Sequence, residues 1–152
     1  MFFGSYEYTV DQKGRVPLPS KFRGEVGDKL YLLKGYEDCI SLYKEEDFRK
    51  LIANIQNLPY ERAKVRQNSR LLASSITEIS VDKVGRIALP KKVISEHHIE
   101  KDVVVIGVID HIEIWDTKKW DEYKTEGEKT FDIDAESLIN TNEKWFPYTS
   151  IA

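Results

Sequence analysis

Two short stretches of the chain carry an aspartate, a glycine and an arginine at the same spacing, with lysines beside them. They read Asp11-Gln12-Lys13-Gly14-Arg15 and Asp82-Lys83-Val84-Gly85-Arg86. Arginine and lysine bind anions, and arginine can also donate two parallel hydrogen bonds to a planar acceptor. The aspartate can accept backbone N–H groups of a tight turn, while glycine allows the positive φ that such a turn needs. The candidate binding residues are therefore Lys13, Gly14, Arg15, Lys83, Gly85 and Arg86, and Asp11 and Asp82 are candidate turn-stabilising residues.

Either stretch alone is typical of a structural hairpin turn, in which the arginine pairs with the aspartate at the surface. Retention of the pattern in two copies, each beside extra lysine or arginine, favours a binding role. A rigid hairpin that presents an arginine fits the major groove of DNA, where the guanidinium can bond to guanine O6 and N7. The neighbouring lysines would bind phosphates without reading sequence.

The two turns belong to an internal repeat. Five residues of the first stretch recur 71 positions later: Asp11, Gly14, Arg15, Leu18 and Pro19 return as Asp82, Gly85, Arg86, Leu89 and Pro90. Downstream matches such as Gly35 with Gly107 are offset by 72 positions, which implies one inserted residue in the second copy. Such a repeat indicates a duplicated fold. Since one unit of about 45 residues would bury too little surface to be stable alone, the copies are expected to pack together, or chains to pair.

The predicted fold class is mixed α+β, with two duplicated β-hairpin modules and helices on the outside. Each glycine turn is expected at the tip of a hairpin, and Pro19 and Pro90 fit the first turn of a short helix. An amphipathic helix is expected at 44–57, where apolar residues follow helical spacing. Strands are expected at 6–11, 15–18, 29–33 and 40–43 in the first copy and at 78–82, 86–89, 103–108 and 112–115 in the second.

The segment between the copies and the end of the chain have their own charge patterns. Arg62, Arg66 and Arg70 recur at i+4, so a helix over 60–75 would carry a positive stripe. Like charges at this spacing repel by about 0.2–0.5 kcal/mol per pair, which favours an anionic partner: either phosphate or the carboxylates of a neighbouring copy or chain. The acidic, aperiodic tail from Thr125 is expected to be partly ordered, with the aromatic cluster at 145–148 docking on the body.

The charge is segregated along the chain. The net charge is −3, but residues 96–152 carry 6 Lys/Arg against 14 Asp/Glu, so residues 1–95 are positive by 5. The basic residues of that part are concentrated at the two turns. A nucleic-acid partner is therefore compatible with the acidic overall composition, since distribution matters more than the sum.

Other functional classes lack the residues they need. Cys39 is the one cysteine, which excludes an intrachain disulfide, and we expect it to be a small buried side chain. Adjacent His97 and His98 point to different sides of a helix, unlike a helical zinc pair. The sequence has no nucleophile–base motif, no phosphate-binding glycine loop and no apolar run long enough to span a membrane. We expect no enzyme activity, no cofactor, no metal, no membrane contact and no small-molecule substrate.

Three segments together resemble the bacterial MraZ family, a duplicated relative of the AbrB-type regulators. They are Met1-Phe2-x-Gly4, the stretch from Asp11 to Arg23 with its Leu18-Pro19 and Phe22-Arg23 pairs, and the stretch from Asp82 to Pro90. The resemblance covers about residues 1–124. It departs from the family pattern at Val84, a position that is usually polar, while Lys83 carries the charge one residue earlier.

The resemblance implies a swapped-hairpin fold, in which the modules form a small double-split β-barrel. It also implies a cytoplasmic, nucleoid-associated regulator of the division and cell wall gene cluster, which binds tandem G-rich promoter repeats in double-stranded DNA as a ring-shaped homo-oligomer. The expected organisation is a first AbrB-like module at 5–50, a helical linker at 51–77, a second module at 78–124 and an acidic tail at 125–152.

Two other functions remain open from the sequence. One is an antitoxin-like protein of the same fold, whose acidic tail occupies a toxin. The other is a structural ring or adaptor that uses the same turns to bind protein. Salt dependence separates DNA binding from the adaptor, because phosphate contacts make DNA affinity fall steeply with salt.

Overall fold

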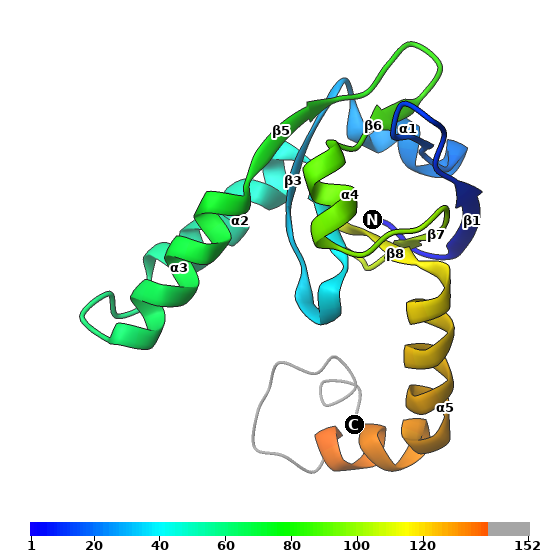
Figure 1. Ribbon diagram of the computed structural model, residues 1–152. Coiled ribbons are helices and arrows are strands. Elements are labelled where there is room, and N and C mark those ends of the chain that lie inside the picture. The colour runs from blue at the N-terminus through cyan, green and yellow to red at the C-terminus, as the bar shows by residue number, and fades with distance from the viewer. Residues whose placement is uncertain (140–152) are drawn as a thin grey trace. The chain divides into compact units, whose positions relative to one another are not determined.

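The computed structural model describes residues 1–139 and divides the chain into two compact units, Met1–Thr117 and Lys118–Ala152. The first unit holds both turns and all the strands (Figure 1). The fold is α+β, as the sequence predicts. The aromatic cluster expected at 145–148 lies outside the described residues.

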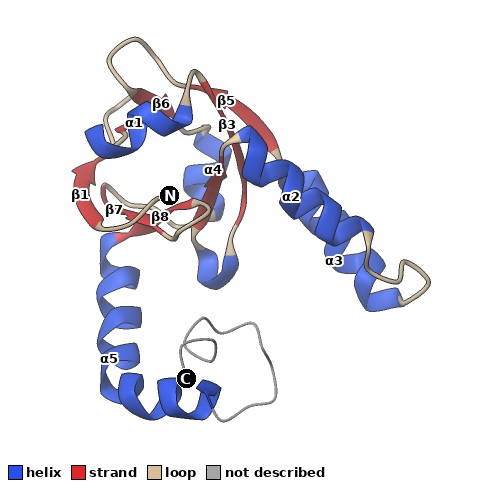
Figure 2. Cartoon of the chain, turned by 180° about the vertical axis from the view of Figure 1, so that it is seen from behind, coloured by secondary structure: helices blue, strands red, loops and turns tan. Residues whose placement is uncertain are grey.

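Most strands of the first unit form one antiparallel sheet of six strands in the order β1-β7-β8-β4-β3-β5. The remaining two, β2 and β6, form a separate two-stranded ribbon. Figure 2 shows the same strands from behind. In chain order the strands are β1 (Ser5–Thr9), β2 (Arg15–Pro17), β3 (Lys29–Lys34), β4 (Ile40–Tyr43), β5 (Thr77–Ser80), β6 (Arg86–Ala88), β7 (Asp102–Gly107) and β8 (Ile112–Asp116).

The strand pairing joins the two copies. β1 of the first copy pairs with β7 of the second, and β5 of the second copy pairs with β3 of the first. β2 pairs with β6, and β4 with β8, again between copies. Among the named strands, only β3–β4 and β7–β8 pair within a copy. Neither copy is therefore a separate sheet, and the duplicated units share one core.

The expectation of two local hairpins holds only at the turns. The Asp11 N–H donates to the Arg15 carbonyl at 3.1 Å, and the Asp82 N–H donates to the Arg86 carbonyl at 2.8 Å. In the second copy an antiparallel bridge between Val81 and Ile87 continues the hairpin, and the flanking strands otherwise pair with strands of the other copy. The physical reason is burial: β2 and β6 are three residues long, and pairing them together places Val16 opposite the equally buried Ile87.

The core lies between the sheet and the ribbon. Phe2 and Phe22 pack edge to face with ring centroids 5.2 Å apart, which is a favourable aromatic geometry. Cys39 is 2% exposed, which confirms that it is a small buried side chain. The largest fully buried side chains of the described residues include Phe2, Leu18, Leu30, Leu32, Ile40, Leu42, Ile87, Ile112 and Ile114.

Two short helices follow the ribbon strands at equivalent places. They are α1 (Ser20–Val26) and α4 (Lys91–Glu96), and each begins directly after a proline. Pro19 and Pro90 have φ values of −53° and −58°. These values suit a helix start, where the missing N–H of proline has no intrahelical partner to lose.

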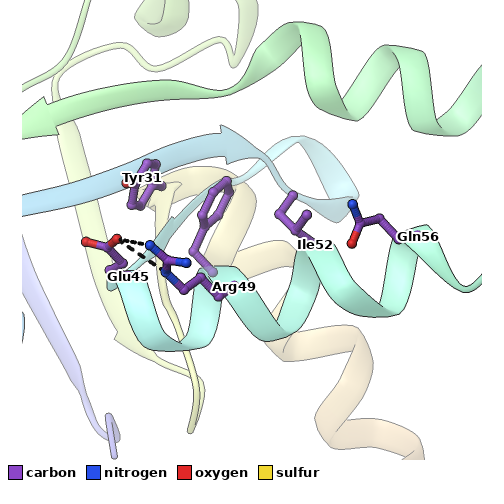
Figure 3. A pocket seen from close by; sticks show the side chains of 6 residues that line it. Tyr31, Glu45, Arg49, Ile52 and Gln56 are labelled. Atoms are coloured by element: carbon purple, nitrogen blue, oxygen red, sulfur yellow. Dashed lines mark hydrogen bonds and ion pairs between the residues drawn. The ribbon is translucent and has the colours of Figure 1, made fainter.

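The helices α2 (Glu45–Gln56) and α3 (Ala63–Ser75) lie beside each other and extend from the sheet in both overall views (Figures 1 and 2). The expected amphipathic helix at 44–57 is confirmed as α2. Its Phe48 stacks on Tyr31 of β3 with ring centroids 4.1 Å apart and planes 6° from parallel. One turn earlier, Glu45 accepts a hydrogen bond from Arg49 at 2.9 Å, which Figure 3 shows as a dashed line.

The second unit is described by the helix α5 (Thr117–Ile139), 23 residues long. The sequence predicts partial order but no helix for the tail from Thr125, whereas residues 125–139 are helical. Local side-chain pairs at helical spacing account for the difference: Lys129 bonds to Glu126 at 2.8 Å, and Thr130 to Asp134 at 2.6 Å. Among residues 1–139, no helix is both long and apolar enough to cross a membrane.

Candidate nucleic-acid interface

The first turn is held by the carboxylate of Asp11. Its Oδ1 accepts the backbone N–H groups of Lys13 at 2.9 Å and of Arg15 at 2.8 Å, while Oδ2 accepts the Arg15 Nε at 2.6 Å. The Gly14 N–H closes the turn on the Asp11 carbonyl at 3.0 Å, and Gly14 has a φ of +76°. One carboxylate thus fixes both the backbone of the turn and the direction of the arginine.

The second turn repeats this arrangement bond for bond. Asp82 Oδ1 accepts from the backbone of Val84 at 3.0 Å and of Arg86 at 2.9 Å, and its Oδ2 accepts the Arg86 Nε at 2.9 Å. Gly85 has a φ of +82°, and its N–H donates to the Asp82 carbonyl at 3.0 Å. Both copies therefore present their arginine in the same way.

Both carboxylates are held in the charged form. The backbone N–H of Arg15 is the largest cause that lowers the pKa of Asp11 below its ordinary value of 3.8, against an opposing effect of desolvation. The guanidinium of Arg15 and the N–H of Lys13 lower this pKa further. The pKa of Asp82 is lowered by the corresponding groups of Arg86 and Val84. Since each arginine bonds through Nε, the two terminal nitrogens of its guanidinium lie outside that bond.

The ribbon places the two arginines on one face. Arg15 lies opposite Ala88, and Pro17 lies opposite Arg86, so the two arginines are diagonal neighbours. Such neighbours are roughly 7–8 Å apart. Side chains alternate along a strand, and the intervening Val16 is fully buried, so the arginines lie on the opposite, outer face of the ribbon. Their side chains are 34% and 35% exposed.

Each turn is also bonded to the other copy. The Leu18 N–H donates to the Gly85 carbonyl at 2.9 Å, and the Leu89 N–H donates to the Gly14 carbonyl at 2.8 Å. A Cβ at position 14 would lie 2.6 Å from the Leu89 carbonyl oxygen. The close approach of the two backbones, together with the positive φ, therefore requires glycine at this position.

The structure brings together the residues that the sequence singles out. Lys13 and Lys83 are exposed at the two turns, two and three residues before the arginines of those turns. Val84, at the tip of the second turn, is 58% exposed, so no cation occupies the place that Lys13 has in the first turn.

Arg23 also lies at the second turn, although the turn pattern does not mark it. Its Nε donates to the Leu18 carbonyl at 2.9 Å, and its Cδ lies 2.6 Å from where a Cβ at position 85 would be. The repeat carries no sign of this role, because the equivalent residue of the second copy is Ile94. The contact depends on strand exchange between the copies, which the sequence alone does not disclose.

The arginine stripe of the linker is partly satisfied within the chain. Arg66 Nη1 donates to the backbone carbonyls of Tyr60 at 3.1 Å and of Glu61 at 2.8 Å. These carbonyls precede α3, so Arg66 stabilises the loop before the helix. The charge pattern of the sequence favours an anionic partner for all three arginines of the stripe. Arg66 instead has hydrogen-bond acceptors within its own chain.

None of the residues that line the pocket beside α2 belongs to either turn. One pocket of about 360 Å³ lies along α2, lined by Tyr31, Glu45, Phe48, Arg49, Ile52 and Gln56 (Figure 3). Its charged groups pair with each other, and no nucleophile lines it. Burial raises the pKa of the Cys39 thiol, which keeps it protonated and unreactive. Within residues 1–139, no cluster of three His, Cys, Asp or Glu side chains is arranged to hold a metal ion.

Comparisons with known proteins agree with the repeat. A family model described as "MraZ protein, putative antitoxin-like" matches residues 1–71 and again residues 72–142. A protein of Thermoanaerobacter pseudethanolicus, named "Transcriptional regulator MraZ", is 39% identical over 142 residues, which cover 93% of this chain and 99% of the relative. A protein of Syntrophomonas wolfei with the same name is 36% identical over 140 residues, or 92% and 98% of the two chains.

Proposed function

The chain belongs to the MraZ family, and we propose on that premise that it is a sequence-specific DNA-binding regulator of transcription. The relatives are named transcriptional regulators, which is not an enzyme class. The single observation that carries the proposal is the common outer face of the ribbon, where two carboxylate-anchored arginines lie side by side. Because their Nε atoms are already fixed, the guanidinium groups lose little freedom when they bind.

In this proposal the arginines and lysines have different roles. Arg15 and Arg86 bond to base edges in the major groove, for which guanine O6 and N7 are the matched acceptors. Lys13 and Lys83 bind phosphates and set the position on the duplex. Gly14 and Gly85 allow the turns to approach the backbone closely, and Asp11 and Asp82 hold the arginines in place.

We also propose the finer features that the family resemblance implies. The exchange of β1 and β5 between copies supports a double-split β-barrel of the AbrB type. The proposed modules are 5–50 and 78–124, with a helical linker at 51–77 and an acidic tail at 125–152. Further proposals are a ring-shaped homo-oligomer in the cytoplasm and nucleoid, without cofactor, and tandem G-rich repeats of the division and cell wall gene cluster as the DNA target.

An antitoxin-like role is the second candidate, because the family description contains that term. The exposed acidic helix α5 supports it, since none of its described side chains is buried. Removal of residues 125–152 separates the two functions. The deletion abolishes partner binding but leaves DNA affinity unchanged if the tail is a protein-binding segment.

Fluorescence anisotropy of the full chain with labelled duplexes tests the proposed function. The duplexes carry one G-rich repeat, two or three tandem repeats, or a scrambled sequence, and each is titrated from 50 to 200 mM salt. We expect affinity to rise with repeat number, because linked sites add effective concentration, and to fall steeply with salt. Equal and weak binding to all the duplexes would contradict the proposal and favour an adaptor that binds protein.

A further inference from the structure

The geometry points to Arg23, a residue of the first copy, as a phosphate-binding side chain of the second turn. This inference rests on the proposed DNA-binding function and deepens it, because it adds a cation that the repeated motif does not contain. It would give the second turn a cation besides Lys83, because Val84 stands where the first turn has Lys13.

Leu18 links Arg23 to the second turn. The Leu18 N–H donates to the Gly85 carbonyl at 2.9 Å, and the Leu18 carbonyl accepts the Arg23 Nε, also at 2.9 Å. The side chain of Arg23 then lies over Gly85, where its Cδ and Cζ are each 2.6 Å from the position of a Cβ at residue 85. The absence of a side chain at Gly85 therefore makes room for the guanidinium.

The same place beside the first turn is apolar. Ile94 occupies the position equivalent to Arg23, 71 residues later, and its Cδ1 lies 3.3 Å from where a Cβ at Gly14 would be. At the position directly before the glycine, the difference between the turns is reversed: Lys13 is cationic in the first turn, and Val84 is apolar in the second. The position directly before the glycine is thus cationic only in the first turn, and the side chain against the glycine is cationic only in the second.

The electrostatic setting of Arg23 suits an external anion. Arg23 is exposed, and within residues 1–139 it forms no ion pair with a carboxylate. Its Nε bond goes to a neutral carbonyl, which orients the planar group but does not neutralise its charge. An oriented, uncompensated guanidinium beside a turn is the arrangement that binds a phosphate. A base-reading role is less suited, since Arg86 already extends from the same turn.

A salt series with matched variants tests the inference. Wild type, Arg23→Ile, Arg23→Lys and the control Arg49→Ile are titrated with the tandem-repeat and scrambled duplexes. Removal of one phosphate contact lowers the slope of log affinity against log salt by about 0.9. The affinity advantage of wild type over Arg23→Ile is then expected to shrink about threefold between 50 and 200 mM salt, equally on both duplexes. Arg23→Lys keeps the wild-type slope, because a phosphate contact needs only the charge, and Arg49→Ile leaves it unchanged.

Two further measurements distinguish failure of the Arg23 inference from failure of the proposed DNA-binding function: the thermal unfolding midpoint of each variant and the DNA affinity of Arg15→Ala. An unchanged slope for Arg23→Ile, with loss of specific binding in Arg15→Ala, overturns the role of Arg23 and leaves the proposed function intact. If Arg23→Lys lowers the slope of log affinity against log salt as much as Arg23→Ile does, and both variants have a lower unfolding midpoint, Arg23 has a purely structural role. That result also overturns the inference. If wild type itself binds both duplexes weakly and without salt dependence, the proposed function fails first.

Discussion

The two Asp-x-x-Gly-Arg turns have the same internal bonds but different surroundings. In each, one carboxylate oxygen accepts two backbone N–H groups and the other accepts the arginine Nε. Around this shared frame the first turn has Lys13 at its tip and Ile94 against its glycine. The second has Val84 at its tip and Arg23 against its glycine.

This difference teaches which parts of the duplicated unit are constrained. Asp11 and Gly14, like Asp82 and Gly85, hold the backbone of the turn: the aspartate accepts its N–H groups, and the glycine adopts the positive φ without a steric cost. The cations only need to lie within reach of an anion, so their positions can differ between copies. Strand exchange allows one copy to supply a charge at the turn of the other.

The largest expected effect comes from the two arginines. Arg15→Ala and Arg86→Ala should each cost about 1–3 kcal/mol of binding free energy on the G-rich duplex, which corresponds to a loss of affinity of roughly 5- to 150-fold. The two losses should be similar, because the two anchoring geometries are the same. Anisotropy titration of each variant checks this.

Arg49→Ala is the matched control for both variants. Arg49 also pairs with a carboxylate four residues away, Glu45, but it lies on α2 and not on the ribbon. It should leave DNA affinity within experimental error. A large loss in Arg15→Ala with none in Arg86→Ala would mean that only the first turn reads bases.

Alanine substitution of the turn glycines should lower the free energy of unfolding by different amounts at the two turns. Gly14→Ala places its Cβ 2.6 Å from a backbone carbonyl, whereas Gly85→Ala meets the movable side chain of Arg23. Both variants also carry the strain of a positive φ, about 1–2 kcal/mol. Gly14→Ala should therefore lower the free energy of unfolding more than Gly85→Ala does, by an added ~1 kcal/mol. Urea denaturation monitored by circular dichroism measures the difference; equal costs would contradict the backbone contact at Gly14.

The turn tips should differ in salt dependence. Lys13→Ala should lower the slope of log affinity against log salt by about 0.9, and Val84→Lys should raise it by a similar amount. Both changes should be the same on specific and scrambled duplexes, because phosphate contacts carry no base information. Lys50→Ala, which removes a lysine on α2 paired with Glu46, serves as the control. A loss confined to the specific duplex would instead assign base reading to Lys13.

The smallest effect concerns the two aspartates and pH. The pKa of each is lowered in the folded state, first by a backbone N–H, so their contribution to stability is present above about pH 4 and is lost as pH falls through the folded pKa. NMR titration of the carboxyl carbons should give midpoints below 3.8 for Asp11 and Asp82. In Arg15→Ala the Asp11 midpoint should rise only partly, because residue 15 keeps its N–H. A wild-type midpoint at or above 3.8 would contradict the turn geometry.

Much of the fold follows from local patterns, but the pairing of the strands does not. The apolar runs and prolines predict β3, β4, β7, β8 and the starts of α1 and α4. The exchange of β1 and β5 between copies does not follow from the apolar pattern, since a local hairpin satisfies the same alternation of apolar residues; only the resemblance to a swapped-hairpin family implies it. The sequence does not predict the helical state of residues 125–139, because few apolar residues mark it and charged pairs at helical spacing support it instead.

The candidate site was largely predictable because its residues stand together in the sequence. Asp11 and Arg15 contact each other within one turn, and Asp82 and Arg86 do the same, so no tertiary knowledge is needed. Arg23 is different, since its place beside Gly85 depends on a contact between residues 62 positions apart in the sequence. Such contacts follow from the strand exchange and become visible only in three dimensions.

The specificity ratio of the double variant Arg15→Ala/Arg86→Ala tests the central claim most directly. It is the affinity for tandem G-rich repeats divided by the affinity for the scrambled duplex, measured by anisotropy at one fixed salt concentration. If the two anchored arginines read bases, the wild type has a large ratio and the double variant a ratio near one, with weak binding retained through the lysines. A double variant that keeps the wild-type ratio would contradict the claim and move sequence reading to another surface of the molecule.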